Sequence, residues 1–140
     1  MVSINRAVPV LQVADVAKSI AWYAGVLGFS GDPFPERPPY RFAILRRDNV
    51  ELMLQRGPND VTELRGTPSP PRVGWAVYLR LEGGQLLALA EGVRRQTPLL
   101  RGPERMFYGQ VEFEVADPDG HRLCIAEVLS ASAEVPFAKE

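Results

Sequence analysis

Few side chains in this 140-residue sequence could carry out nucleophilic or metal chemistry. The sequence holds one histidine, His121, and one cysteine, Cys124, three positions apart. A divalent metal in a catalytic site normally takes about three ligands from His, Asp, Glu or Cys side chains. A thiol becomes a nucleophile only where a neighbouring base or cation activates it. The chemistry open to this chain therefore depends on which residues the fold places beside these two.

Both residues lie in a predicted β-hairpin. Residues 110–116 (QVEFEVA) alternate between apolar and acidic side chains, as a half-buried strand does, and residues 117–120 (DPDG) have the composition of a tight turn. A second strand is expected at 121–128 (HRLCIAEV). We interpret His121, directly after the turn, as a residue of local hydrogen bonding.

Strand alternation predicts which side chains share a face with Cys124. Arg122 is two positions away and is expected on the same face, so it is the candidate cation for activating the thiol. Glu127 is three positions away and is expected on the opposite face. A site on the Cys124 face would therefore include the arginine and exclude this carboxylate.

The rest of the chain predicts one order of elements that occurs twice. The first set is a strand at 7–13, a helix at 16–27, an extended piece at 29–34 and strands at 40–46 and 50–56. The second set is a strand at 73–81, a helix opening at Gly83 and Gly84, a short strand at 97–100, a turn or loop at 101–105 and the hairpin. Asp15 and Gly28 are suited to the N-cap and the C-terminal glycine of the first helix.

Composition limits the class of protein. With 46% hydrophobic residues, a 140-residue chain can bury a core as one domain without metals or disulfides. A formal net charge of −1 gives no sign of a nucleic-acid or membrane surface. The lone cysteine fits a reducing compartment, and we recognise neither a membrane-spanning run nor a signal peptide, so we expect a cytoplasmic protein.

Two end segments and the repeated element order resemble the vicinal oxygen chelate superfamily. That superfamily includes glyoxalase I, extradiol dioxygenases, fosfomycin-resistance proteins and bleomycin-resistance proteins. The segments are VPVLQVADVAKSIAWYAGVLGF and YGQVEFEVADPDGHRLCIAE, and the resemblance covers about residues 6–128. The start AVPVL, together with Glu112 and Phe113 before the turn, is most similar to the bleomycin-resistance branch.

The resemblance implies an α+β fold in which two βαβββ modules form curved, mostly antiparallel sheets around a cleft. It also implies a homodimer. Residues 1–140 would then be a single domain, with module one at about 6–56, a linker at about 57–72, module two at about 73–128 and a tail at 129–140.

The resemblance also implies where metal-using members hold their ion. The corresponding positions in this chain are Val8, Glu51, Ala76 and Cys124. Val8 and Ala76 have no ligating side-chain atom, and one carboxylate with one thiol is too few for a divalent metal. We therefore predict no metal and no cofactor.

Alternation along the strands then predicts the residues that line the cleft. They are Val8, Val10, Gln12, Glu51, Met53, Ala76, Tyr78, Arg80, Tyr108, Arg122 and Cys124. Such a lining suits an extended, partly planar organic molecule, and its two arginines favour a neutral or anionic ligand over a cationic one. We interpret Trp22 and Trp75 as packing residues, the second because its parity is opposite to that of Ala76.

These observations favour a metal-free protein that binds an aromatic or amphipathic small molecule, in the manner of antibiotic or toxin sequestration. Two enzymatic alternatives stay open, beside a regulatory or interaction module. One is a metal-dependent lyase, isomerase or dioxygenase of the same superfamily with atypical ligands. The other is a metal-independent enzyme that uses Glu51, Arg80 or Cys124. We expect neither a nucleic-acid partner nor a membrane partner.

Overall fold

The chain folds into two compact units, Met1–Pro68 and Ser69–Glu140. The structure is a computed structural model that describes residues 1–57 and 71–139. Each unit contains one helix and one four-stranded sheet, and this confirms the α+β class with two modules. None of the described helices is long and apolar enough to cross a membrane.

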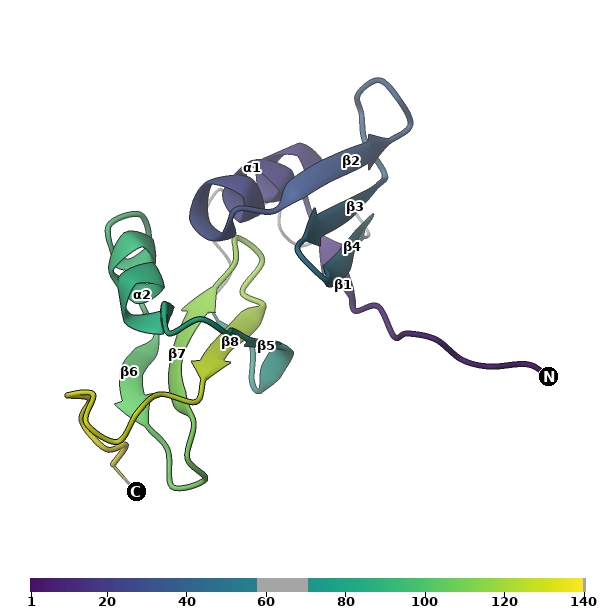
Figure 1. Ribbon diagram of the computed structural model, residues 1–140. Helices are drawn as coiled ribbons and strands as arrows, with labels where there is room; N and C mark the ends of the chain where they lie inside the picture. Colours follow the sequence, from purple (N-terminus) through teal and green to yellow (C-terminus); the bar gives the residue numbers. More distant parts are fainter. Residues whose placement is uncertain (58–70, 140) are drawn as a thin grey trace. The chain divides into compact units, whose positions relative to one another are not determined.

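The first unit contains a mixed sheet with one helix. Its elements are β1 (Val10–Val13), α1 (Val16–Leu27), β2 (Ser30–Phe34), β3 (Phe42–Arg47) and β4 (Val50–Arg56) (Figure 1). The strand order is β1-β4-β3-β2, in which β1 is parallel to β4 and the other pairs are antiparallel. β2 lies at the edge, where a strand tolerates the missing N–H of Pro33.

The helix α1 begins and ends where its sequence predicts. The side chain of Asp15 accepts a hydrogen bond from the backbone N–H of Lys18 at 3.0 Å. Gly28 adopts the left-handed conformation, at φ 72°, and its N–H donates to the carbonyl oxygen of Ala24. A side chain at this φ would be strained, so glycine is suited to ending the helix here.

The second unit repeats the topology of the first. Its elements are β5 (Trp75–Arg80), α2 (Leu86–Arg94), β6 (Arg101–Arg105), β7 (Val111–Ala116) and β8 (Arg122–Glu127) (Figure 1). The strand order is β5-β8-β7-β6, in which β5 is parallel to β8. The predicted hairpin is confirmed as the antiparallel pair β7 and β8.

The edge strand β6 departs from the prediction. The sequence predicts a strand at 97–100 and a loop at 101–105, whereas the strand is Arg101–Arg105. Gly102 and Pro103 are typical of loops, but an edge strand tolerates proline. The register of β6 on β7 also shifts between Arg101 and Glu104, and a bulge of this kind accommodates glycine.

One face of each sheet forms the core with the helix of its own unit. In the first unit, the buried sheet residues are Leu11, Val13, Ala43, Leu45, Leu52 and Leu54, and those of α1 are Val16, Tyr23 and Leu27. In the second unit, they are Val77, Val111, Phe113, Val115, Leu123 and Ile125, and those of α2 are Leu86, Ala90 and Val93. The residues that alternate with them lie on the other face of each sheet, and there the predicted ligand contacts are found.

Glu127 lies on the helix side of its sheet, where its side chain caps the N-terminus of α2. Its carboxylate accepts hydrogen bonds from the backbone N–H groups of Gly84, at 2.6 Å, and Leu86, at 3.1 Å. The first N–H groups of a helix have no partner within it, and the helix dipole favours a negative charge there. The prediction that Glu127 lies opposite Cys124 is therefore confirmed.

Candidate functional site

The face of the second sheet that points away from α2 gathers the polar and aromatic side chains of this unit. Cys124 of β8 pairs with Tyr78 of β5 on one side and with Glu114 of β7 on the other. Directly paired residues share a face of a sheet. This surface, which we call the site face, holds Trp75, Tyr78, Arg80, Arg101, Glu112, Glu114, Arg122 and Cys124.

Glu112 is a fully buried carboxylate at the centre of the site face. Its Oε2 accepts hydrogen bonds from the hydroxyls of Tyr78, at 2.7 Å, and Tyr108, at 2.6 Å. Its Oε1 accepts one from Nη2 of Arg101 at 2.8 Å. Burial alone would raise the pKa of Glu112, but these three hydrogen bonds outweigh it and lower the pKa below its ordinary value. Glu112 is therefore a stable anion that holds two tyrosine rings in place.

Glu114 is held by two arginines. Nε of Arg101 donates to its Oε2 at 2.5 Å, and Nη2 of Arg122 lies 2.8 Å from its Oε1. Arg101 also donates to Oε1 of Glu104 at 2.7 Å, so one guanidinium joins three carboxylates. Burial would raise the pKa of Glu114, yet hydrogen bonds from Arg101 and Trp75 and the charges of both arginines lower it. The carboxylates of the site face are thus ionised and compensated.

The glycine bulge in β6 explains how Arg101 reaches this network. Gly102 has φ 81°, and a Cβ at this position would lie 2.3 Å from the carbonyl oxygen of Glu112. Only glycine permits this conformation and this close approach to β7 without distortion. The sequence interpretation placed Arg101 in a loop, so it missed the residue with the most ionic contacts on the site face.

Cys124 lies beneath the network as an inert thiol. It is fully buried, and Nη2 of Arg101 is 3.9 Å from its sulfur. Burial, followed by the negative charge of Glu112, raises the pKa of the Cys124 thiol far above its ordinary value. Arg122, the predicted activating cation, pairs with Glu114 instead. A neutral, inaccessible thiol is a poor nucleophile.

Trp75 corrects the sequence interpretation, which treated it as a packing residue. The register of β5 on β8 shifts between Trp75 and Val77, so Trp75 pairs with Arg122 and lies on the site face. Its ring centroid is 5.1 Å from that of Tyr78, and the residue is 48% exposed. The parity argument failed because a bulge adds one residue to the count. Ala76, which was predicted to line the cleft, is the residue at the shift and is exposed.

The remaining predicted residues of the second unit lie around this aromatic pair. The guanidinium carbon of Arg80 lies 5.8 Å from the centroid of the Tyr78 ring, and the residue is exposed. Tyr108, at the turn between β6 and β7, is bound to Glu112 by its hydroxyl while 44% of the residue is exposed. Trp75, Tyr78, Tyr108 and Arg80 therefore form an aromatic surface with a cation beside it.

The predicted residues of the first unit belong to the face of its sheet that points away from α1. Val10 pairs with Met53 in register, and Val10 is 51% exposed. Gln12 follows two positions along β1 and is exposed, whereas Val8 precedes the strand and is half-buried. The structure thus brings Val10, Gln12 and Met53 together on one face of this sheet.

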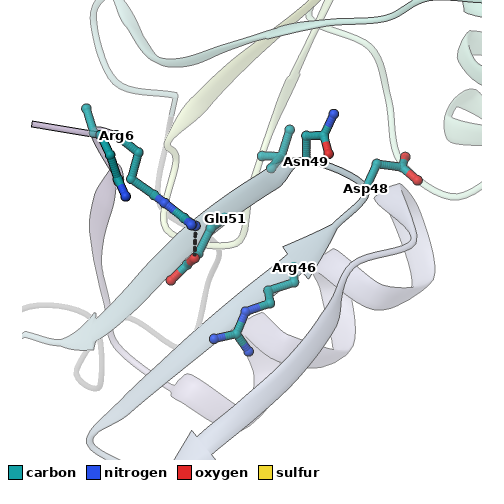
Figure 2. A pocket seen from close by; sticks show the side chains of 8 residues that line it. Arg6, Arg46, Asp48, Asn49 and Glu51 are labelled. Carbon is teal, nitrogen blue, oxygen red and sulfur yellow. Dashed lines mark hydrogen bonds and ion pairs between the residues drawn. The ribbon is translucent and has the colours of Figure 1, made fainter.

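Glu51 lies at the end of that face, in a cavity of about 460 Å³. Figure 2 shows the Arg6 guanidinium directed at the Glu51 carboxylate, and the two groups form a salt bridge at 2.9 Å. The cavity is lined by Asn5, Arg6, Ala7, Arg46, Asp48, Asn49, Val50 and Glu51. The Glu51 carboxylate is thus occupied by an ion pair within its own unit.

The four positions at which relatives hold a metal do not fit one in this chain. Val8 and Ala76 offer no donor atom, the thiol of Cys124 is buried, and Glu51 is paired with Arg6. Among residues 1–57 and 71–139, no group of three or more His, Cys, Asp and Glu side chains is arranged to hold a metal ion. The expectation of a metal-free protein stays a prediction.

His121 belongs to the turn, as its position predicts. Its backbone N–H donates to Oδ1 of Asp117 at 2.8 Å, and its carbonyl oxygen accepts from the N–H of Asp117 at 3.0 Å. The same Oδ1 accepts from the N–H of Asp119 at 2.9 Å. These bonds close the turn between β7 and β8 and position Cys124 three residues later.

Comparison with known proteins shows the family. Residues 3–125 match the model of the Glyoxalase/Bleomycin resistance protein/Dioxygenase superfamily, and the chain belongs to this superfamily. No functionally curated protein matches it.

Solved structures show the same fold at low sequence identity. A glyoxalase-related enzyme from Clostridium phytofermentans is 19% identical, with a TM-score of 0.64 over 91% of this chain and 98% of that one. A protein of unknown function from Agrobacterium tumefaciens is 21% identical, with a TM-score of 0.63 over 92% and 98%. The bleomycin-binding protein of Streptomyces verticillus, in complex with copper(II)-bleomycin, is 24% identical, with a TM-score of 0.53 over 93% and 99%.

Proposed function

We propose that the protein binds a small, planar organic molecule on the aromatic surface of the site face and acts by binding it, without catalysis. The observation that carries this proposal is the pair formed by the exposed ring of Trp75 and the half-buried ring of Tyr78, with centroids 5.1 Å apart. Adjoining aromatic rings that open onto solvent on one side are suited to stacking on a flat ligand.

The two tyrosines of this surface are fixed before any ligand arrives. Both hydroxyls donate to the same carboxylate oxygen of Glu112, which Arg101 holds from the other side. A prearranged surface loses little conformational freedom on binding. Burying roughly 200 Å² of apolar ring surface contributes about 5 kcal/mol before the cost of association. Binding in the micromolar range is therefore reasonable for a ligand that is also held at its polar end.

The ionisable groups of the site face are better suited to binding a ligand than to acid–base or nucleophilic catalysis. The lowered pKa of Glu112 makes it a weak base, and the raised pKa of the Cys124 thiol makes it a weak nucleophile. The donor set also does not favour the metal-dependent lyase, isomerase or dioxygenase, because two of its four positions are Val8 and Ala76. Binding is therefore the function that the side chains support best.

The family gives this binding a biological use. One structural relative is named as a bleomycin-binding protein from a bleomycin producer. By analogy, this chain would act by sequestering an antibiotic or toxin, as a homodimer in the cytoplasm. The ligand would differ from cationic bleomycin, because the carboxylates of the site face are already paired with arginines.

A thermal-shift screen of planar aromatic compounds tests the proposal. A ligand should raise the melting temperature of the wild type and of a Trp22→Phe control, and should not raise that of Trp75→Ala. Trp75 is 48% exposed, so its removal should leave the fold intact, and circular dichroism checks this. Ligands that stabilise Trp75→Ala as strongly as the wild type would place the site elsewhere and contradict the proposal.

A further inference from the structure

We infer that the ligand of the site face is an organic anion whose acid group is bound by Arg80. The inference rests on the proposed function and names the chemical class of its ligand. Among the described residues, the charged side chains of the site face form ion pairs with one another, except for Arg80, and the inference follows from this difference.

The acidic groups of the site face have no capacity left for a cationic ligand. Glu112 already accepts hydrogen bonds from two tyrosine hydroxyls and one guanidinium. Glu114 is bound by Arg101 and Arg122. A cationic ligand would have to displace one of these buried contacts, and breaking such a pair leaves an uncompensated charge.

The same contacts occupy two of the three arginines. Arg101 distributes its guanidinium over Glu104, Glu112 and Glu114. Arg122 uses both Nε, at 3.1 Å, and Nη2, at 2.8 Å, on one oxygen of Glu114. Neither guanidinium is available to a ligand without loss of the network that fixes the tyrosines.

Arg80 is the cation that remains. Within the part of the chain that the structure describes, the Arg80 side chain forms no salt bridge and no hydrogen bond, and its guanidinium carbon lies over the Tyr78 ring, 5.8 Å from the centroid. This cation–π contact holds the guanidinium beside the aromatic surface while its five N–H donors stay open. A guanidinium in this state is suited to binding a carboxylate, sulfonate or phosphate in a charge-assisted pair.

Arg80 and the aromatic pair are close enough for one ligand to contact both, with its acid group on Arg80 and its ring on Trp75 and Tyr78. Arg80 and Tyr78 are two positions apart on β5, and Trp75 lies beyond Tyr78 on the same face. A flat ring stacked on Trp75 and Tyr78 would therefore place an acid substituent at its edge within reach of Arg80. An anionic aromatic compound satisfies both contacts at once, whereas a neutral one satisfies only the stacking.

Two dyes that differ by one acid group test this inference. They are 8-anilinonaphthalene-1-sulfonate, which is anionic, and N-phenyl-1-naphthylamine, which is its neutral counterpart. Each is titrated by fluorescence into the wild type, Arg80→Gln, Trp75→Ala and Arg95→Gln. Arg95 serves as the matched control because it is an exposed arginine at the C-terminal end of α2, on the helix side of the same unit.

The wild type should bind the sulfonate roughly tenfold or more tightly than the neutral dye. Arg80→Gln should lose this preference because its affinity falls for the sulfonate dye alone. Arg95→Gln should keep the preference. Added salt should weaken sulfonate binding in the wild type much more than in Arg80→Gln. Trp75→Ala should bind both dyes more weakly than the wild type does.

The contrary results separate the two proposals. In one contrary result, Trp75→Ala binds both dyes more weakly than the wild type does, but Arg80→Gln binds them as tightly as the wild type. This result would overturn the anion inference and leave the proposed function standing. Dyes that fail to bind the wild type saturably, or that bind Trp75→Ala as tightly as the wild type, would overturn the proposed function and the inference with it.

Discussion

Glu112 is the residue on which the site face depends. One of its oxygens accepts from two tyrosine hydroxyls and the other from Arg101. Alternation along 110–116 already placed Glu112 and Glu114 on one side of β7, and their pairing with β8 places both on the face of Cys124. The sequence interpretation left these two carboxylates out of the site, although the same alternation would have included them.

Glu112→Gln should destabilise the protein in a pH-dependent way. A glutamine keeps the shape but removes the charge that Arg101 binds, so we expect a loss on the order of 2 kcal/mol at pH 7. The folded-state pKa of Glu112 is lowered, so its ionic stabilisation is present above the unfolded value of about 4.3 and disappears as the pH falls through the folded value. The difference between wild type and variant should therefore narrow towards pH 3.

Urea unfolding at pH 7 and pH 3 measures this difference. Glu91→Gln is the control, because Glu91 is an exposed residue of α2 whose pairing with Arg94 is solvent-accessible. A Glu112→Gln penalty of equal size at both pH values would show that the charge of Glu112 does not contribute.

Cys124 should be unreactive in the folded protein. The residue is fully buried and the pKa of its thiol is raised, so it offers neither access nor thiolate. We expect a chromogenic disulfide reagent to modify no thiol in the native protein at pH 8 and one thiol per chain in urea. Rapid native modification would instead revive the enzyme that uses Cys124 as a nucleophile.

At the scale of elements, the bulge of β6 is what delivers Arg101 to the site face. Gly102→Ala should destabilise the protein by about 1–3 kcal/mol, because φ is 81° there and the added Cβ would meet the Glu112 carbonyl at 2.3 Å. Gly92→Ala is the matched control. Gly92 lies within α2 with no atom within 4 Å of an added Cβ, so alanine should stabilise the helix by about 0.5–1 kcal/mol.

Chemical unfolding of both variants checks the comparison. If Gly102→Ala unfolds at the same urea concentration as the wild type, the bulge is not needed for the fold of β6.

The sequence predicts the elements well wherever local chemistry decides them. Asp15 and Gly28 bound α1, and residues 117–120 close the hairpin, because a cap or a turn depends on neighbouring residues alone. The errors occur at bulges. Trp75 changes face through a register shift in β5, and Arg101 lies in a strand whose Gly102 and Pro103 are typical of loops. A bulge depends on the partner strand, so the sequence of one strand does not show it.

At the scale of the whole molecule, the two units repeat one topology, and the family model covers 3–125. The predicted residues divide between the units: Val8, Val10, Gln12, Glu51 and Met53 lie in the first, and the other six lie in the second. The predicted linker at 57–72 falls mostly outside the described residues. The expectation of a single domain stays a prediction.

The homodimer is a prediction at this scale. On the face of the first sheet that points away from α1, Val10 is 51% exposed on β1 and Phe34 is 47% exposed on β2, and the half-buried Met53 and Ile44 lie on the two strands between them. A sheet face with several exposed apolar side chains is typical of surfaces that a partner covers. Light scattering after size exclusion should give twice the 15.5 kDa of one chain. A mass of one chain that persists at millimolar concentration would contradict the dimer.

The central claim is that Trp75 lies in the binding site, and the indole N–H signals in a proton–nitrogen NMR spectrum test it most directly. The chain has two tryptophans, Trp22 in α1 and Trp75 in β5, and a Trp22→Phe variant assigns their signals. On titration with 8-anilinonaphthalene-1-sulfonate, the Trp75 signal should shift and saturate while the Trp22 signal stays in place. A Trp75 signal that does not move while the dye binds would contradict the account.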